Sequence, residues 1–222
     1  MVIDNPFIVI TSTGEEEVVD RVEESIDLQL YINEVINNGG IILINGDPGV
    51  GKSTIINFVL RDIKKRDDIK VNKDSFTPSV LSKIKSLSKE TGKKLLVILD
   101  DFNNIELIDK DQRDGIIRLL NELGSIGIGI IVVNNTKNNK TQKLINKIKT
   151  KFYIINVRGM KDEDIKKIII NRLNLIRKTK SNSLSPFTEE EIDKIIKEAR
   201  GNPRIVLLIC ATLYDTKKEK LI

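Results

Sequence analysis

Residues 46–53 carry a pattern that could bind phosphate. The segment Gly46-Asp-Pro-Gly-Val-Gly-Lys52-Ser53 matches G-x-x-x-x-G-K-[ST], the P-loop pattern. Its glycines let the main chain curve until several N–H groups converge on one anion, and Lys52 would reach the outer phosphates of a nucleotide. The Ser53 hydroxyl would bind Mg²⁺. We therefore predict that the phosphates are held by Gly46, Asp47, Pro48, Gly49, Val50, Gly51, Lys52, Ser53 and Thr54.

Two carboxylates follow a wholly apolar run further along the chain. Residues 95–99 read as a buried strand, and Asp100 and Asp101 come directly after it. In a P-loop protein an acid at this point can hold the magnesium ion through water, which is the role we predict for Asp100. Asp101 would then polarise the attacking water. The alternative is a pair of acids that merely ends a strand.

Two later polar features could complete a catalytic site. Asn134 and Asn135 follow the strand-like residues 129–133, and a neutral amide there could position water without adding negative charge. The alternative is a turn in which asparagine tolerates left-handed geometry. Arg204 follows Asn202-Pro203, an N-cap and a first-turn proline, so it lies where the helix dipole disfavours a cation. We interpret Arg204 as reaching toward an anion, and an ordinary surface arginine is the alternative.

These residues need a scaffold, and the order of the apolar patterns predicts one. Strand-like runs alternate with amphipathic helical segments, which favours a parallel α/β sheet. After Val157 the strand signals stop and only helices follow. We predict an αβα nucleotide-binding domain over residues 1–157 and a helical lid domain over residues 158–222. The predicted strands are residues 41–44, 69–72, 95–99, 127–133 and 152–157, and the predicted helices are residues 15–37, 53–64, 78–89, 112–123, 141–148, 162–176, 188–199 and 203 onward.

Composition excludes several classes of protein. The chain has one cysteine, Cys210, and no histidine, so a disulfide framework, a multi-cysteine zinc site and a Ser-His-Asp hydrolase are excluded. The apolar runs are far shorter than the ~20 residues of a membrane-spanning helix, and the first residues lack a signal-peptide pattern. We therefore expect a cytoplasmic protein with no membrane partner.

The charge is distributed unevenly along the chain. Its formal net value is +5, but residues 137–180 carry 14 Lys or Arg against 3 acids, a local net of +11. Residues 15–27 are instead acidic, with seven acids and one arginine, Arg21. Opposed patches of this kind favour DNA binding through residues 137–180 or head-to-tail self-association. Two solvated helical faces are the alternative.

In this order, the P-loop, the acidic strand end, the asparagine strand end and Gly201-Asn-Pro-Arg204 resemble the AAA+ ATPases. The resemblance covers roughly residues 15–215 and is strongest to origin-recognition initiators and signal-transduction NTPases, including archaeal members. It implies a P-loop NTPase with a five-stranded, mainly parallel sheet between helices, plus a small C-terminal helical lid. It also implies ATP or ADP with Mg²⁺ as ligands, Asn135 rather than Asn134 as sensor 1, and Arg204 as sensor 2.

The chain departs from the family pattern in three ways. Asp101 stands where the family usually has Glu, which could slow hydrolysis. The cations of residues 143–151 are all lysines, and Lys147 is the nearest match to an arginine finger, although lysine lacks the planar two-point contact of arginine. About 18 residues follow Arg204, where initiators carry a winged-helix domain, so we expect DNA contacts from the ATPase and lid surfaces.

The leading hypothesis is an ATP-hydrolysing switch that acts on DNA, of the initiator, helicase-loader or transposition-regulator type. Lys52, Asp101, Asn135 and Arg204 would be catalytic, and Ser53 and Asp100 would bind the metal ion. The protein would work as a homo-oligomer or with an AAA+ partner. One alternative is a signalling or assembly ATPase that binds protein partners without nucleic acid. Another is a small-molecule phosphotransferase.

Overall fold

The computed structural model describes residues 5–8, 21–90, 92–135 and 144–219, which group into two compact units. The sheet unit comprises residues 23–47 and 55–157. The helical unit comprises residues 48–54 and 158–222 together with residues 1–22, as far as these are described. The domain boundary expected after Val157 stays a prediction.

Five strands form one sheet with the order β2-β3-β4-β1-β5, and neighbouring strands all run parallel. The predicted five-stranded parallel sheet is therefore confirmed. β1 and β4 are buried along their whole length, as expected for central parallel strands that are covered on both faces. The strands are β1 (Gly40–Asn45), β2 (Ile69–Ser75), β3 (Lys94–Asp100), β4 (Gly129–Asn134) and β5 (Phe152–Asn156).

β2 continues beyond its predicted end. Its register with β3 runs to the pair Ser75 and Asp100, whereas apolar residues predict a strand only to Asn72. The last three residues of β2, Lys73, Asp74 and Ser75, are exposed at the edge of the sheet. Polar residues on an edge strand carry no apolar signal, so hydrophobicity alone could not locate this end.

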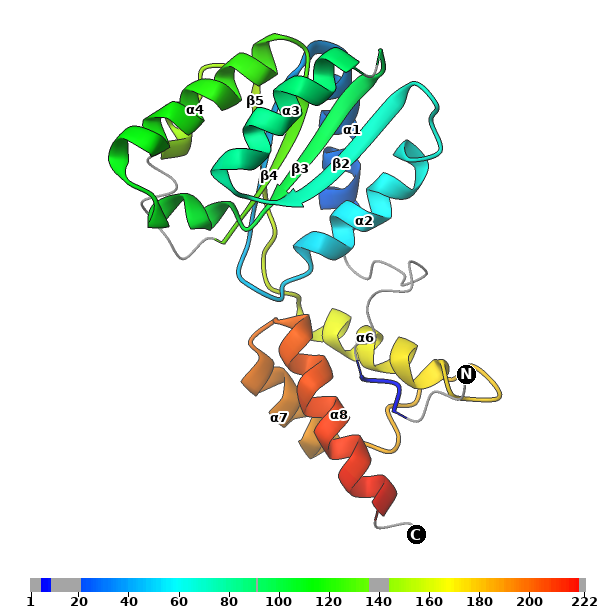
Figure 1. Cartoon of the computed structure of the whole chain (residues 1–222). Coiled ribbons are helices and arrows are strands. Elements are labelled where there is room, and N and C mark those ends of the chain that lie inside the picture. The colour runs from blue at the N-terminus through cyan, green and yellow to red at the C-terminus, as the bar shows by residue number, and fades with distance from the viewer. Residues whose placement is uncertain (1–4, 9–20, 91, 136–143, 220–222) are drawn as a thin grey trace. The chain divides into compact units, whose positions relative to one another are not determined.

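Helices cover both faces of the sheet. Figure 1 shows α3 and α4 on one face and α1 on the other. The helix predicted over residues 15–37 is described from Val22, and residues 15–20 lie outside the described residues, as do residues 141–143 of the helix predicted over 141–148. The helices before β4 are α1 (Val22–Asn38), α2 (Lys52–Ile63), α3 (Pro78–Glu90), the 3₁₀ helix η1 (Phe102–Leu107) and α4 (Lys110–Ser125).

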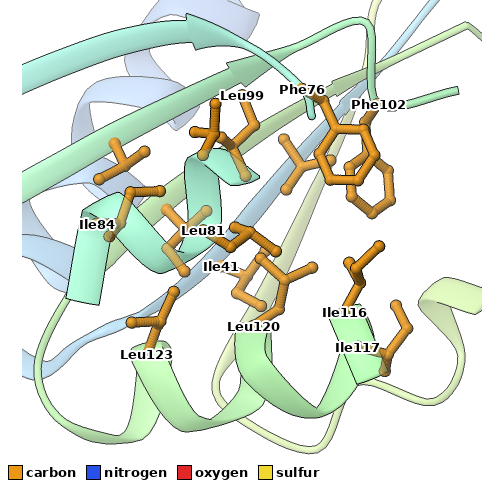
Figure 2. Close-up of a cluster of buried hydrophobic side chains, with 14 of the residues drawn as sticks. Ile41, Phe76, Leu81, Ile84, Leu99, Phe102, Ile116, Ile117, Leu120 and Leu123 are labelled. Atoms are coloured by element: carbon orange, nitrogen blue, oxygen red, sulfur yellow. The ribbon is translucent and has the colours of Figure 1, made fainter. Parts of the chain in front are cut away.

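One hydrophobic core lies between the sheet and helices α3 and α4 (Figure 2). Phe76 follows β2 and Phe102 begins η1, and their rings meet edge to face with centroids 4.9 Å apart. The Phe76 N–H donates to the Asp100 carbonyl oxygen at 2.7 Å. A buried aromatic pair of this kind adds about 0.5–1.5 kcal/mol beyond its area. It joins the residue after β2 to the residue that follows Asp101.

The helical unit has its own core. It is built on α6 (Asp162–Asn174), α7 (Glu189–Ala199) and α8 (Pro203–Glu219), and α7 begins with the predicted capping box of Thr188 and Glu191. Phe7 is 1% exposed and packs against Phe187 and Tyr214, so the described N-terminal residues belong to this core.

Burial raises the pKa of Cys210 to about 12, which makes its thiol a poor nucleophile. In the part of the chain that the structure describes, every helix is too short or too polar to span a membrane.

Candidate nucleotide site

Three of the predicted site elements lie at one edge of the sheet unit. β1, β3 and β4 are parallel neighbours, so their carboxyl ends meet at the same edge. β1 ends at Asn45, directly before the P-loop residue Gly46, while β3 ends at Asp100 and β4 at Asn134. The carboxyl edge of a parallel sheet is the usual ligand-binding edge of α/β proteins.

Asp100 and Asp101 occupy different environments. The Asp100 Oδ1 atom accepts a hydrogen bond from the Asp101 N–H at 3.0 Å, and its Oδ2 atom lies 3.7 Å from the Lys73 Nζ. Asp101 is exposed and has a left-handed backbone with φ 54°. Aspartate tolerates this conformation better than most residues. Asp100 is therefore held by its neighbours, whereas the Asp101 carboxylate faces solvent.

Asparagine side chains link the ends of three strands. The Asn134 Nδ2 donates to the Asn45 Oδ1 at 3.1 Å, and the Asn45 Nδ2 donates to the Asn156 Oδ1 at 3.2 Å. Asn45 is 5% exposed and Asn134 is 3% exposed. Among the described residues the buried Asn134 Oδ1 accepts no hydrogen bond. The apolar pattern does not predict this ladder. An asparagine ends each of β1, β4 and β5, and this repetition could have indicated it.

The two adjacent asparagines point to different partners. Asn134 takes part in the ladder, whereas Asn135 is half-buried and donates through its Nδ2 to the Asn103 Oδ1 at 3.3 Å. Asn135 therefore links the end of β4 to η1, the element that follows Asp101. Its assignment as sensor 1 stays a prediction.

The P-loop residues 48–54 are described with the helical unit. Gly49 and Gly51 have φ angles of +89° and +104°, which side-chain-bearing residues rarely adopt. α2 begins at Lys52, whose side chain is buried with 8% exposure. The first N–H groups of a helix have no intrahelical acceptors, and the helix dipole adds positive potential there. These residues fit a phosphate, and the exposed Ser53 in the same turn supplies an oxygen that fits Mg²⁺.

The start of α8 contacts the P-loop within the helical unit. The Asn202 Nδ2 donates to the Pro48 carbonyl oxygen at 2.8 Å. The Asn202 Oδ1 accepts from the Arg204 N–H at 3.1 Å and so caps α8. A Cβ on Gly49 would lie 2.9 Å from the Arg204 Cβ. The structure thus brings the predicted residue Arg204 next to the P-loop, and Asn202 has a second role that its capping position did not reveal.

Arg21 also contacts the P-loop, and the sequence reasoning missed it. This side chain is only 6% exposed, and its Nη2 donates to the carbonyl oxygens of Val50 at 3.2 Å and Arg158 at 2.7 Å. Carbonyl oxygens held by a guanidinium fix the local direction of the main chain. An isolated arginine among seven acids reads as part of a solvated face, so its burial could not be read from composition.

The predicted finger residue Lys147 has a partner in its own chain. Its Nζ lies 2.6 Å from the Asp114 Oδ1 on α4, and this contact lowers the pKa of the Asp114 carboxyl. Lys151, in the same basic stretch, pairs with Glu34 on α1, and the pair lowers the pKa of Glu34 and raises that of Lys151. The finger role of Lys147 stays a prediction. Residues 137–143 of the basic segment lie outside the described residues.

Comparison with known proteins gives matches at the level of structure. No protein-family model matches the chain, and no curated protein matches it. Drosophila ORC bound to DNA superposes with a TM-score of 0.70 at 14% identity, over 98% of this chain and 60% of that one. The Aeropyrum pernix Orc1 protein in complex with DNA gives 0.68 at 14% identity, over 97% and 65%. Cdc6p from Pyrobaculum aerophilum gives 0.64 at 16% identity, over 91% and 62%.

These neighbours test the resemblance drawn from the motifs. The chain spans 60–65% of their length, and identities of 14–16% establish the fold alone. The parallel sheet order, the P-loop after β1 and the helical unit agree with the predicted architecture. The chain therefore has the fold of the AAA+ P-loop ATPases and resembles the archaeal initiators among them.

Proposed function

We propose that this chain binds ATP with Mg²⁺ at its P-loop and hydrolyses it as a conformational switch. The observation that carries the proposal is the geometry of residues 49–52: two glycines at positive φ lead directly into α2, whose first residue is the buried Lys52. A buried ammonium group at the N-terminus of a helix is suited to a multiply charged phosphate.

The proposed roles follow from chemistry and position. Lys52 and the main-chain N–H groups would bind the β- and γ-phosphates, and Ser53 and Asp100 would hold the metal ion. Mg²⁺ would neutralise phosphate charge. Asp101, exposed at the end of β3, would accept a proton from the water that attacks the γ-phosphorus, while the bond to the bridging oxygen of ADP breaks. Asn135 would orient that water, and Arg204 would stabilise the charge on the transferred group.

The switch would act through the start of α8. Asn202 donates to the Pro48 carbonyl oxygen, and Arg204 lies against Gly49. A phosphate bound by the P-loop would therefore change the surroundings of both residues. Differential contacts of this kind are what a ligand needs to shift a conformational equilibrium.

We propose that the switch acts on DNA. Residues 137–180 carry 14 Lys or Arg against 3 acids, and two of the structural neighbours are complexes with DNA. Phosphate contacts by such residues make affinity fall with salt concentration. The protein would assemble as a homo-oligomer or with an AAA+ partner. A cytoplasmic location and a role of initiator, helicase-loader or transposition-regulator type stay predictions.

Gel filtration of wild type and Lys52→Ala, with and without ATP–Mg²⁺ and a mixed-sequence DNA duplex, tests these proposals together. We expect a DNA complex that forms with ATP in wild type and is lost in the variant. The alternative, an assembly ATPase for protein partners, gives larger species with ATP alone and no DNA complex. A DNA affinity that depends neither on ATP nor on salt concentration would overturn the proposed switch on DNA.

A further inference from the structure

Helix α1 carries an apolar face that no described residue covers. Val22, Ile26 and Leu30 recur at intervals of four, so they lie along one side of the helix. They are 66%, 52% and 60% exposed. The buried face of α1 is formed by other residues: Leu28, Ile32, Val35 and Ile36. Single exposed aliphatic residues are ordinary, but three in a row on a helix mark an interaction surface.

We call the face formed by Val22, Ile26 and Leu30 the α1 surface. Acidic residues border it. Helix α1 contains four acids, Glu23, Glu24, Asp27 and Glu34, and no Lys or Arg. Glu23 and Asp27 are exposed and lie one position after Val22 and Ile26. A partner that covers the stripe therefore needs an apolar centre with positive charge around it. Two α1 surfaces placed against each other would bring like charges together, which disfavours a symmetric α1–α1 pair.

The chain itself presents a surface with the complementary chemistry. Leu175 and Ile176, directly after α6, are 56% and 36% exposed. Lys178 and Lys180 follow them and are exposed, and no acid occurs between residues 165 and 188. Leu175, Ile176, Lys178 and Lys180, which we call the α6 end, thus combine exposed aliphatic side chains with positive charge. The α1 surface combines exposed aliphatic side chains with negative charge.

We propose that the α1 surface of one copy docks on the α6 end of a second copy, so that the chains associate head to tail. This inference rests on the proposed self-association and names the surfaces that make it. Since the two contacting surfaces differ, the contact is heterologous, and an open assembly keeps one unpaired α1 surface at one end and one unpaired α6 end at the other. Burial of the aliphatic residues would supply affinity, and the opposite charges would set orientation and salt dependence.

Two charge-reversal variants test the pairing by sedimentation equilibrium at low salt, with and without ATP–Mg²⁺. One is Glu23→Lys with Asp27→Lys, and the other is Lys178→Glu with Lys180→Glu. We expect wild type to form dimers or larger species and each variant alone to associate at least about tenfold more weakly. An equimolar mixture should regain association, because the two unaltered surfaces can pair with each other and the two reversed surfaces again carry opposite charges.

The apolar part has its own matched comparison. Ile26→Ser with Leu30→Ser should weaken association, whereas Leu107→Ser should not, although Leu107 is 86% exposed on η1. Circular-dichroism melts establish that all variants fold, and association regained by the mixture requires two folded variants.

Each other outcome overturns the inference at a defined point. A wild type that stays monomeric in every condition removes self-association and leaves the nucleotide proposal standing. Association that the variants do not weaken places the interface elsewhere. A mixture that stays monomeric while wild type associates contradicts the head-to-tail pairing, and a basic helix from another protein would then be the occupant to examine.

Discussion

At the scale of single residues, substitutions at Gly49 and Gly51 distinguish backbone strain from steric clash in the P-loop. Both have positive φ, but a Cβ on Gly51 would meet no atom within 4 Å, whereas on Gly49 it would lie 2.7 Å from the Asn202 Oδ1. Gly51→Ala adds backbone strain of about 1–3 kcal/mol, and Gly49→Ala adds a clash to the same strain. We expect Gly51→Ala to lower Tm by about 2–12 °C and Gly49→Ala to lower it further.

Differential scanning calorimetry of the two glycine variants checks this order. Equal melting temperatures for the two variants would mean that a Cβ at residue 49 does not clash with the start of α8. A Gly49→Ala variant more stable than Gly51→Ala would contradict the contact with Asn202 outright.

Asp101 allows the catalytic proposal to be tested without disturbing the backbone. Asparagine tolerates the left-handed conformation of this residue as well as aspartate does, so Asp101→Asn removes a base and keeps the turn. We expect unchanged ATP affinity and a fall in kcat of about 10²–10⁴-fold, the usual contribution of a general base. Single-turnover hydrolysis measures the effect, with the exposed Asp111→Asn as control. Unchanged hydrolysis would move the base to another residue.

At the scale of elements, helix α7 depends on its capping box. The Thr188 Oγ1 accepts from the Glu191 N–H at 3.2 Å, and the Glu191 carboxylate accepts from the Thr188 N–H at 2.8 Å. Thr188→Ala should cost about 1 kcal/mol of unfolding free energy, or about 2–4 °C in Tm. Thermal unfolding followed by circular dichroism measures the loss. No change in Tm would mean that α7 is held by its packing alone.

The same cap gives a pH dependence. The Thr188 N–H and Lys217 lower the pKa of Glu191 below 4.5. A lowered folded-state pKa stabilises the protein above the unfolded pKa, and this stabilisation is lost as pH falls through the folded value. The Tm difference between wild type and Glu191→Gln should therefore be present at pH 7 and shrink below about pH 4.5. A difference that stays constant down to pH 3 would contradict the ionised cap.

How far the sequence predicts the elements depends on where each residue lies. β1, β3 and β4 are apolar because both their faces are buried, so hydrophobicity located them closely. Hydrophobicity did not predict the polar end of β2, because these residues are exposed at the sheet edge. The P-loop and Asp100 follow from local spacing. The contacts of Arg21 join residues far apart in sequence, and no local pattern encodes them.

At the scale of the whole molecule, Asn202 offers a way to separate capping from coupling. Asn202→Asp keeps an oxygen that can cap α8 but loses the N–H that donates to the Pro48 carbonyl, and Asn202→Ala loses both. We expect Asn202→Asp to melt close to wild type while its ATP affinity falls, and Asn202→Ala to lose stability as well. Calorimetric melting and ATP titration of both variants separate the effects. Wild-type ATP affinity in Asn202→Asp would mean that this hydrogen bond does not serve nucleotide binding.

Isothermal titration of ATP–Mg²⁺ into wild type and Lys52→Ala measures whether the P-loop binds the nucleotide. Removing a charged hydrogen-bond donor costs about 1.5–3 kcal/mol, so we expect one site in wild type and an affinity about 10- to 150-fold weaker in the variant. Lys83→Ala, which removes an exposed lysine on α3, should bind as wild type does. No binding to wild type, or equal affinity in Lys52→Ala, would show that the P-loop is not the nucleotide site.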